Sequence, residues 1–135
     1  MTARASGTFE VKLIPQPSDD ETQDPTLGRM SIDKQFHGDL EATSQGQMLS
    51  AGSGAKGSSG VYVAIEKVTG TLQGRKGSFV LYHVGVMTSG MPDLKINVVP
   101  GSATDDLQGL AGNMNIVIAD GKHSYEFAYT LATIQ

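Results

Sequence analysis

The fold is decided by the stretch Val61-Tyr-Val-Ala-Ile-Glu-Lys-Val-Thr-Gly-Thr-Leu72, which a turn around Gly74 joins to Ser78-Phe-Val-Leu-Tyr-His-Val-Gly-Val-Met87. Both runs are rich in β-branched and aromatic residues, and a Gly-containing turn separates them, which is typical of a β-hairpin. Alternating runs of this kind, separated by turn-forming residues at about every tenth position, continue along the rest of the sequence. The pattern therefore predicts one closed antiparallel sheet.

The predicted architecture is all-β, with residues 1–135 forming a single eight-stranded antiparallel β-barrel. A chain of 135 residues can bury a sufficient core without disulfides, and this one contains no cysteine. A barrel of about eight strands has a lumen that side chains can fill or that can hold one small ligand. The expected strands are residues 8–14, 29–37, 40–50, 61–72, 78–87, 94–99, 114–119 and 122–131.

Two turns predict the register of their hairpins. Asp120-Gly121 suits a two-residue type I′ turn, which would pair Ala119 with Lys122 and place Ile116 opposite Tyr125. These positions lie on the faces that alternation marks as apolar, so pattern and turn agree. At Gly38-Asp39 we expect a loop one residue longer than the minimum, because it sets Phe36 opposite Ala42 instead of opposite Glu41.

The turn at Gly74 leaves two registers open. A four-residue loop would place Glu66 directly opposite His83, whereas a three-residue loop would place it opposite Tyr82. Either register puts a carboxylate on a largely apolar face.

Composition argues against several classes of function. The net charge is −4, and the ten Lys and Arg residues do not cluster as phosphate binding requires, so we expect no nucleic-acid partner. No apolar run approaches the length of a membrane span, and no apolar segment typical of a signal peptide follows the first residues, so we expect a cytoplasmic protein. The acidic residues Asp19, Asp20, Glu21 and Asp24 are interpreted as a solvated loop.

Neither a cofactor nor a metal is expected. The spacing Gly52-x-Gly54-x-x-Gly57 matches a dinucleotide fingerprint, but more Gly and Ser and then a strand follow it, where the fingerprint needs a helix. The histidines His37, His83 and His123 fall on separate predicted strands, without the close spacing usual for metal ligands.

The hairpin formed by residues 61–72 and 78–87 is apolar on both faces, unlike a strand pair with one face in solvent. The face that carries Val63, Ile65 and Val84 would be a large exposed patch on a monomer. We therefore expect a homo-oligomer that associates through the outside of this hairpin.

Several segments resemble a bacterial family of unknown function. They are Ala5-Ser-Gly-Thr-Phe-Glu-Val-Lys-Leu, Lys34-Gln-Phe-His-Gly-Asp-Leu-Glu-Ala, Gly74-Arg-Lys-Gly-Ser-Phe-Val-Leu-Tyr-His, Gly109-Leu-Ala-Gly and Asp120-Gly-Lys-His-Ser-Tyr. Members of that family are small barrels grouped with the allene oxide cyclase-like superfamily, alongside dirigent proteins. The resemblance spans nearly the whole chain and implies a barrel. The cyclase and dirigent relatives bind apolar molecules inside the barrel and steer their cyclisation or coupling, often as oligomers, but fold alone does not assign a function.

Glu66 and His83 are the candidate chemical pair. Inside a dry barrel they could transfer a proton to or from an apolar substrate, or they could form a buried ion pair that fixes strand register. Lys34 shares the inward face of its strand. It could neutralise a ligand carboxylate, but we expect its ammonium to reach the barrel rim. The proposed ligand walls are aromatic, namely Phe36, Tyr62, Phe79, Tyr125 and Tyr129, although core packing explains the same residues.

The sequence favours a binding module for a small apolar molecule held in the lumen, with Glu66 and His83 as polar contacts. Small inward residues, among them Ala42, Gly46 and Gly85, leave room for such a molecule. An isomerase or cyclase acting through Glu66 and His83 is the alternative, although no known catalytic motif supports an enzyme. An assembly protein with a fully packed lumen and no ligand is the third possibility.

Overall fold

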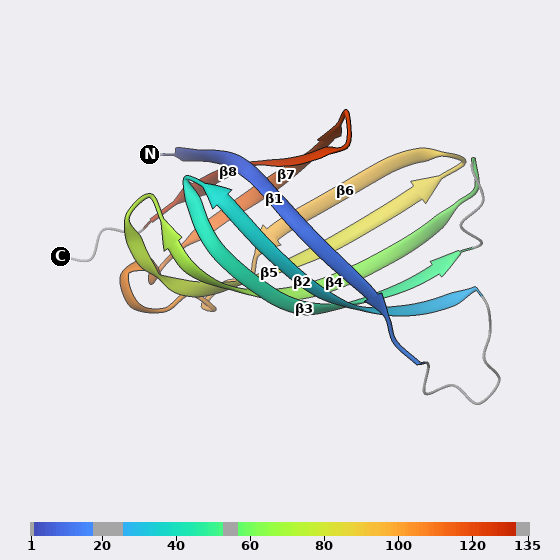
Figure 1. The fold of residues 1–135 in the computed structure, drawn as a ribbon, viewed down its shortest axis with the longest axis horizontal. Coiled ribbons are helices and arrows are strands. Elements are labelled where there is room, and N and C mark those ends of the chain that lie inside the picture. The colour runs from blue at the N-terminus through green and yellow to red at the C-terminus, as the bar shows by residue number, and fades with distance from the viewer. Residues whose placement is uncertain (1, 18–25, 53–56, 132–135) are drawn as a thin grey trace.

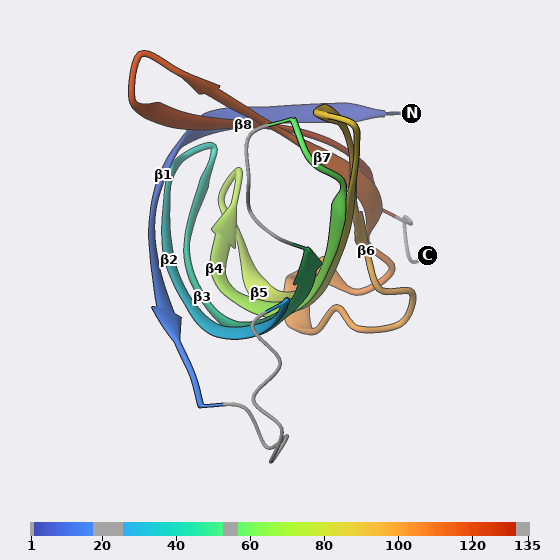
Figure 2. The ribbon, with the colours of Figure 1, turned by 90° about the vertical axis from the view of Figure 1, so that its right-hand side faces the viewer.

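A computed structural model describes residues 2–17, 26–52 and 57–131. These residues form one closed antiparallel β-barrel of eight strands, as the alternation predicts (Figure 1). Viewed along the long axis, the strands surround the interior as a ring (Figure 2). The acidic stretch Asp19–Asp24, and the central residues of the glycine-rich stretch Gly52–Gly57, lie outside the described residues.

Each predicted strand is present, and most extend a few residues beyond the predicted bounds. The strands are β1 (Ala3–Pro15), β2 (Leu27–Gly38), β3 (Leu40–Gly52), β4 (Gly60–Leu72), β5 (Arg75–Thr88), β6 (Met91–Val98), β7 (Ala111–Ala119) and β8 (Lys122–Thr130). The connection from β6 to β7 contains a short 3₁₀ helix, η1 (Asp105–Leu107), which the sequence pattern did not predict.

Each strand pairs with its neighbours in the sequence, and β1 pairs with β8 to close the ring, where Ala3 lies opposite Tyr129. The joint between β6 and β7 differs from the others. Their register consists of one described pair, Asn97 opposite Asn113, whereas the β4–β5 register runs continuously from Gly60 to Leu72. The barrel is therefore closed but has one weak seam.

Two predicted registers are confirmed. Asp120 and Gly121 have φ angles of 52° and 75°, as a type I′ turn requires, and Ala119 lies opposite Lys122. The β2–β3 loop is one residue longer than the minimum, so Phe36 lies opposite Ala42.

The prediction for the β4–β5 turn is wrong in both of its forms. Gln73 and Gly74 form a two-residue turn, with φ angles of 47° and 85°, and Leu72 pairs with Arg75. Glu66 therefore lies opposite Leu81, and His83 lies opposite Ala64. A non-glycine residue can occupy the left-handed region at modest cost, and the sequence offers no strong turn signal at Gln73 that would reveal this shorter loop.

One end of the barrel, here called the packed end, is filled by side chains. It is the end that carries the turns at Gly38–Asp39 and Gln73–Gly74 together with the connection 99–110. Leu107 of η1 and the nearby Leu110 are buried in the core, and the backbone N–H of Ser78 on β5 donates to Oγ1 of Thr104 at 3.1 Å. The connection therefore covers this end of the lumen.

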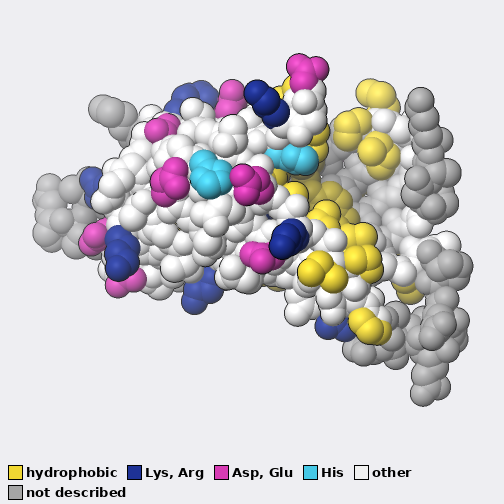
Figure 3. All heavy atoms as spheres, viewed as in Figure 1, with side chains coloured by type: hydrophobic (Ala, Val, Ile, Leu, Met, Phe, Trp, Pro, Cys, Tyr) yellow, Lys and Arg dark blue, Asp and Glu magenta, His cyan; other side chains and the backbone are white. Residues whose placement is uncertain are grey.

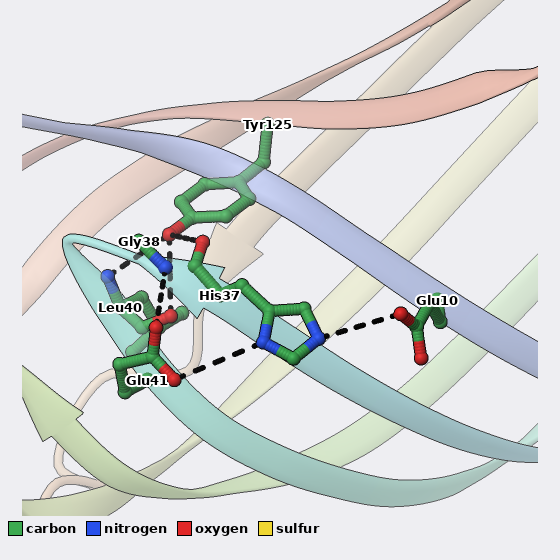
Figure 4. Close-up of polar contacts among 6 residues, drawn as sticks. All are labelled: Glu10, His37, Gly38, Leu40, Glu41 and Tyr125. Atoms are coloured by element: carbon green, nitrogen blue, oxygen red, sulfur yellow. Dashed lines mark hydrogen bonds and ion pairs between the residues drawn. The ribbon is translucent and has the colours of Figure 1, made fainter.

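Tyr125 ties β8 to the β2–β3 turn at the packed end (Figure 4). Its hydroxyl donates to the carbonyl of His37 at 2.9 Å and accepts from the backbone N–H of Leu40 at 2.9 Å. The His37 ring lies on the surface, with Nε2 3.5 Å from Oε1 of Glu10 and Nδ1 3.8 Å from Oε2 of Glu41. Tyr125 thus supplies partners for backbone groups in a turn that the barrel buries from one side.

Within the described residues, the structure contains no helix with the length and apolar character needed to cross a membrane.

Candidate functional site

Four polar side chains meet in the interior, one from each of four consecutive strands. They are Lys34 on β2, Ser44 on β3, Glu66 on β4 and His83 on β5, and all four are buried. Each occupies an inward position of its strand, because successive side chains of a strand point to opposite faces of the sheet. A carboxylate with this little contact with water requires compensating partners.

Glu66 is the centre of this group, and its side chain is fully buried. Its Oε2 accepts from Nζ of Lys34 at 2.9 Å and lies 2.5 Å from Nε2 of His83. Its Oε1 accepts from Oγ of Ser44 at 2.7 Å. Both carboxylate oxygens are therefore satisfied within the protein.

These partners keep Glu66 ionised. Burial alone would raise the pKa of the carboxyl group, but the hydrogen bond from His83 and the positive charge of Lys34 outweigh it and lower the pKa from 4.5 to about 2. An ionised carboxylate can only accept hydrogen bonds, so the facing nitrogen of His83, Nε2, carries a hydrogen. The geometry therefore determines which nitrogen of this imidazole is protonated.

The expectation for Lys34 is wrong, because its ammonium does not reach the rim. Nζ lies inside the barrel, 5.0 Å from the ring centre of Phe9 and 5.4 Å from that of Phe36, in positions suited to cation–π attraction. The ion pair with Glu66 explains the difference, because a buried cation is tolerated when it is paired and hydrogen-bonded. The sequence placed Lys34 on the inward face of its strand, but it did not reveal that the carboxylate it meets is that of Glu66.

A cavity of about 640 Å³ occupies the end of the barrel opposite the packed end, here called the cavity end. The ends of β3 and β5 and the beginnings of β4 and β6 form its walls. Its lining residues are Ser50, Ala51, Gly52, Gly57, Ser58, Ser59, Gly60, Val61, Tyr62, Gly85, Val86, Met87, Gly90, Pro92, Asp93 and Leu94. Small and apolar residues predominate among them, as in many pockets for small molecules.

Tyr62 connects the cavity with the buried polar group. Gly85 lies directly opposite Tyr62 on β5, and the ring of Tyr62 lies against its backbone. A side chain at position 85 would collide with this ring. The ring centre of Tyr62 is 6.2 Å from that of His83, which lies two positions before Gly85 on the same strand. Gly85 therefore permits Tyr62 to lie across the base of the cavity, next to His83.

The predicted site residues fall into two groups. Tyr62 lines the cavity, whereas Glu66 and His83 lie together in the interior and are not among the lining residues. Phe36, Phe79, Tyr125 and Tyr129 are instead buried in the core, away from the cavity lining. The ring of Phe36 meets that of Tyr125 edge-on, and the rings of Phe79 and Tyr129 each stack on Phe127. Side chains thus fill the lumen at the packed end of the barrel, and a cavity occupies the other end.

The three histidines are separate in space as well as in sequence. His83 is buried beside Glu66, His37 is on the surface between two glutamates, and the ring of His123 packs 5.2 Å from that of Phe9. Across residues 2–17, 26–52 and 57–131, no group of three or more histidine and acidic side chains has an arrangement suited to a metal ion.

Comparison with known proteins finds a family and a fold but no activity. The family model described as "Protein of unknown function (DUF3224)" matches residues 5–129. A crystal structure of a DUF3224 protein of unknown function from Shewanella oneidensis MR-1 is similar to the whole chain. It has 47% sequence identity and a TM-score of 0.91, and the match covers 99% of this chain and 100% of that one. No curated protein matches the sequence.

Proposed function

The chain belongs to the DUF3224 family of proteins of unknown function, and on that premise we propose that its barrel binds a small, largely apolar molecule in the cavity end. The cavity of about 640 Å³ is the observation that carries the proposal. Its volume lies within the range of roughly 300–1,000 Å³ found for small-molecule sites. A lumen filled throughout by side chains would have argued for a purely structural role.

The chemistry of the walls supports an apolar ligand. Leu94, Met87 and Pro92 line one side, and the described lining carries one acidic side chain, Asp93, and no basic one. Hydrophobic side chains gather toward this end of the barrel in Figure 3, whereas charged side chains are scattered over the rest of that face. The phenol of Tyr62 and the hydroxyl of Ser50 could supply directional hydrogen bonds.

Binding of the neutral apolar dye Nile red tests this proposal. We expect its fluorescence to rise on addition of the protein, and we expect Ser50→Trp to abolish that rise because the indole would fill the cavity. Thr43→Trp is the matched control, since Thr43 is an exposed residue on the outer face of β3 and is not part of the lining. Equal dye binding by both variants would overturn the proposal.

We also propose that the chain forms a homo-oligomer through an outer apolar face, defined as Leu49, Val63, Ile65 and Val84. Leu49, Val63 and Val84 form one row across β3, β4 and β5, and the exposed fractions of the four residues range from 39% to 62%. A second copy suits this face because a two-fold axis places the same patch of each subunit against the other, so that apolar side chains meet apolar side chains. In sedimentation equilibrium we expect a multiple of 14.2 kDa, and we expect Ile65→Glu to reduce it to the monomer mass. A monodisperse wild-type monomer at micromolar concentration would exclude this association.

An activity of the isomerase or cyclase type is the second candidate function. The direct contact of Glu66 with His83 favours it, because a carboxylate that orients an imidazole is a common arrangement for proton transfer.

A further inference from the structure

We infer that His83 and Tyr62 form a proton-transfer site, with His83 as the base and Tyr62 as the hydrogen-bond donor, for an apolar carbonyl compound that can enolise. The inference rests on the proposed binding of a small molecule in the cavity. It adds the class of substrate and the role of each side chain.

The buried polar residues form a series that leads toward the cavity. Ser44 lies opposite Val68, Glu66 is two residues nearer the cavity end on β4, and Tyr62 is four residues beyond Glu66. His83, opposite Ala64, occupies the level between Glu66 and Tyr62. Proceeding outward, the order is Lys34 with Ser44, then Glu66, then His83, then Tyr62 at the cavity lining.

His83 has one nitrogen committed and one available. Among the described residues its hydrogen-bond partner is Glu66, which it contacts through Nε2. Every buried side-chain nitrogen and oxygen in the described part of the chain has a hydrogen-bond partner, so Nδ1, which has none, belongs to the small accessible part of the ring. In the neutral form of the ring the hydrogen lies on Nε2, so Nδ1 then presents a lone pair that can accept a proton.

Tyr62 supplies the complementary group. Its ring is half-buried at the base of the cavity, where burial, reinforced by the negative charge of Glu66, raises the pKa of the phenol. The phenol therefore stays protonated at neutral pH and can donate a hydrogen bond to a carbonyl oxygen. Tyr62 lines the cavity and the ring of His83 lies next to it in the interior, so the pair offers the donor and the base that enolisation needs.

The chemical step balances without any further reactant. Nδ1 of His83 takes the proton from the carbon next to the carbonyl, and the electron pair of that C–H bond forms the enol double bond. The carbonyl π electrons move to the oxygen, where the O–H of Tyr62 stabilises the developing charge. Return of the proton to the same carbon, or to a conjugated one, regenerates the ketone or its isomer. Glu66 is a positioning residue, because it holds the ring and stabilises the imidazolium that forms.

Deuterium exchange into 2-tetralone, an apolar ketone with acidic C–H bonds, tests the inference. The ketone is incubated with the protein in D₂O, and loss of its C1 proton signal is followed by NMR. We expect exchange faster than with the same concentration of free imidazole. We expect His83→Gln to lower the protein-dependent rate by at least about 100-fold and Tyr62→Phe to lower it by about 100-fold.

Two substitutions of the same chemical kind serve as controls. His37→Gln changes a surface histidine, and Tyr82→Phe changes a half-buried tyrosine next to His83 that faces the other side of the sheet. Neither should alter the exchange rate. Binding of 2-tetralone is measured in parallel by saturation-transfer NMR, which separates loss of binding from loss of proton transfer.

The outcomes distinguish this inference from the proposed binding. If 2-tetralone binds in the cavity without accelerated exchange, the proton-transfer inference fails and cavity binding stands. If Nile red binds and 2-tetralone neither binds nor exchanges, the assignment of a carbonyl substrate is overturned. If neither compound binds, both proposals fail.

Discussion

Replacing Glu66 with glutamine should destabilise the barrel strongly, because it removes the counter-ion of a buried lysine. The amide can still accept from Ser44, but it carries no charge to offset that of Lys34. Only about 5% of the Lys34 side chain is exposed, so solvent cannot replace the lost partner. The substitution changes almost no volume, so the effect reports electrostatics and not packing.

The magnitude follows from leaving the Lys34 ammonium buried without its partner. Breaking a buried ion pair by removing one partner costs about 3–5 kcal/mol. We therefore expect the free energy of unfolding to fall by about 3–5 kcal/mol at neutral pH. That is a large share of the roughly 5–15 kcal/mol typical of a small domain.

Urea unfolding at pH 7, with the slope compared between variants, measures this loss. Glu126→Gln is the matched control, since Glu126 is an exposed acid on β8. Combining Glu66→Gln with Lys34→Met should recover part of the stability, because the double variant buries no unpaired charge. If Glu66→Gln were no more destabilising than Glu126→Gln, the buried ion pair would not contribute as argued.

Three further predictions concern stability. Because folding lowers the pKa of Glu66 from 4.5 to about 2, its ionised form stabilises the fold above about pH 5, and this stabilisation is lost as the pH falls toward 2. The free energy of unfolding of the wild type should therefore fall by about 3 kcal/mol over that range, and Glu66→Gln should not show this fall. Tyr125→Phe leaves backbone groups of the β2–β3 turn without partners and should cost about 1–3 kcal/mol in urea unfolding. Gly7→Ala would force a Cβ against the carbonyl of His37, so thermal unfolding should show a loss of at least about 1–3 kcal/mol; an unchanged Tm would refute the close β1–β2 approach.

The architecture was predictable because the alternation has a period that only strands satisfy. Where a turn carries strong chemistry, as at Asp120-Gly121, the register also followed from the sequence. The predicted length of the β4–β5 turn was wrong because Gln73 is not a typical residue for positive φ, which made the two-residue loop hard to recognise. The η1 helix is a single short turn within a Gly- and Asp-rich connection, and a pattern of that length has no readable period.

The pairing of Glu66 with His83 was identified even though the predicted register was wrong. In the structure the two residues are diagonal neighbours on the inner face, and diagonal positions are within reach of long side chains. The contact between Glu66 and His83 therefore needs both residues on the same face of the sheet, but it does not need them directly opposite each other. Lys34 could not be assigned in this way, because its partner lies two strands away and only the three-dimensional arrangement brings them together.

The division of the lumen was also beyond sequence reasoning. Tyr62 and Phe79 share the alternation of the same hairpin, yet one lines the cavity and the other is buried in the core. What separates them is distance along the barrel axis, together with the cover that residues 99–110 provide at one end. A strand pattern reports which side of the sheet a residue faces, but it does not report how far along the tube the filling extends.

The seam between β6 and β7 has a consequence for how the wall of the cavity is held. Pro92 and Leu94 belong both to β6 and to the cavity wall, and the described ladder joins β6 to β7 through Asn97 and Asn113 alone. Backbone pairing in the described chain therefore ties the first half of β6 to β5 but not to β7. This stretch of the cavity wall is bound to the ring along one edge, whereas most other strands are laddered along both.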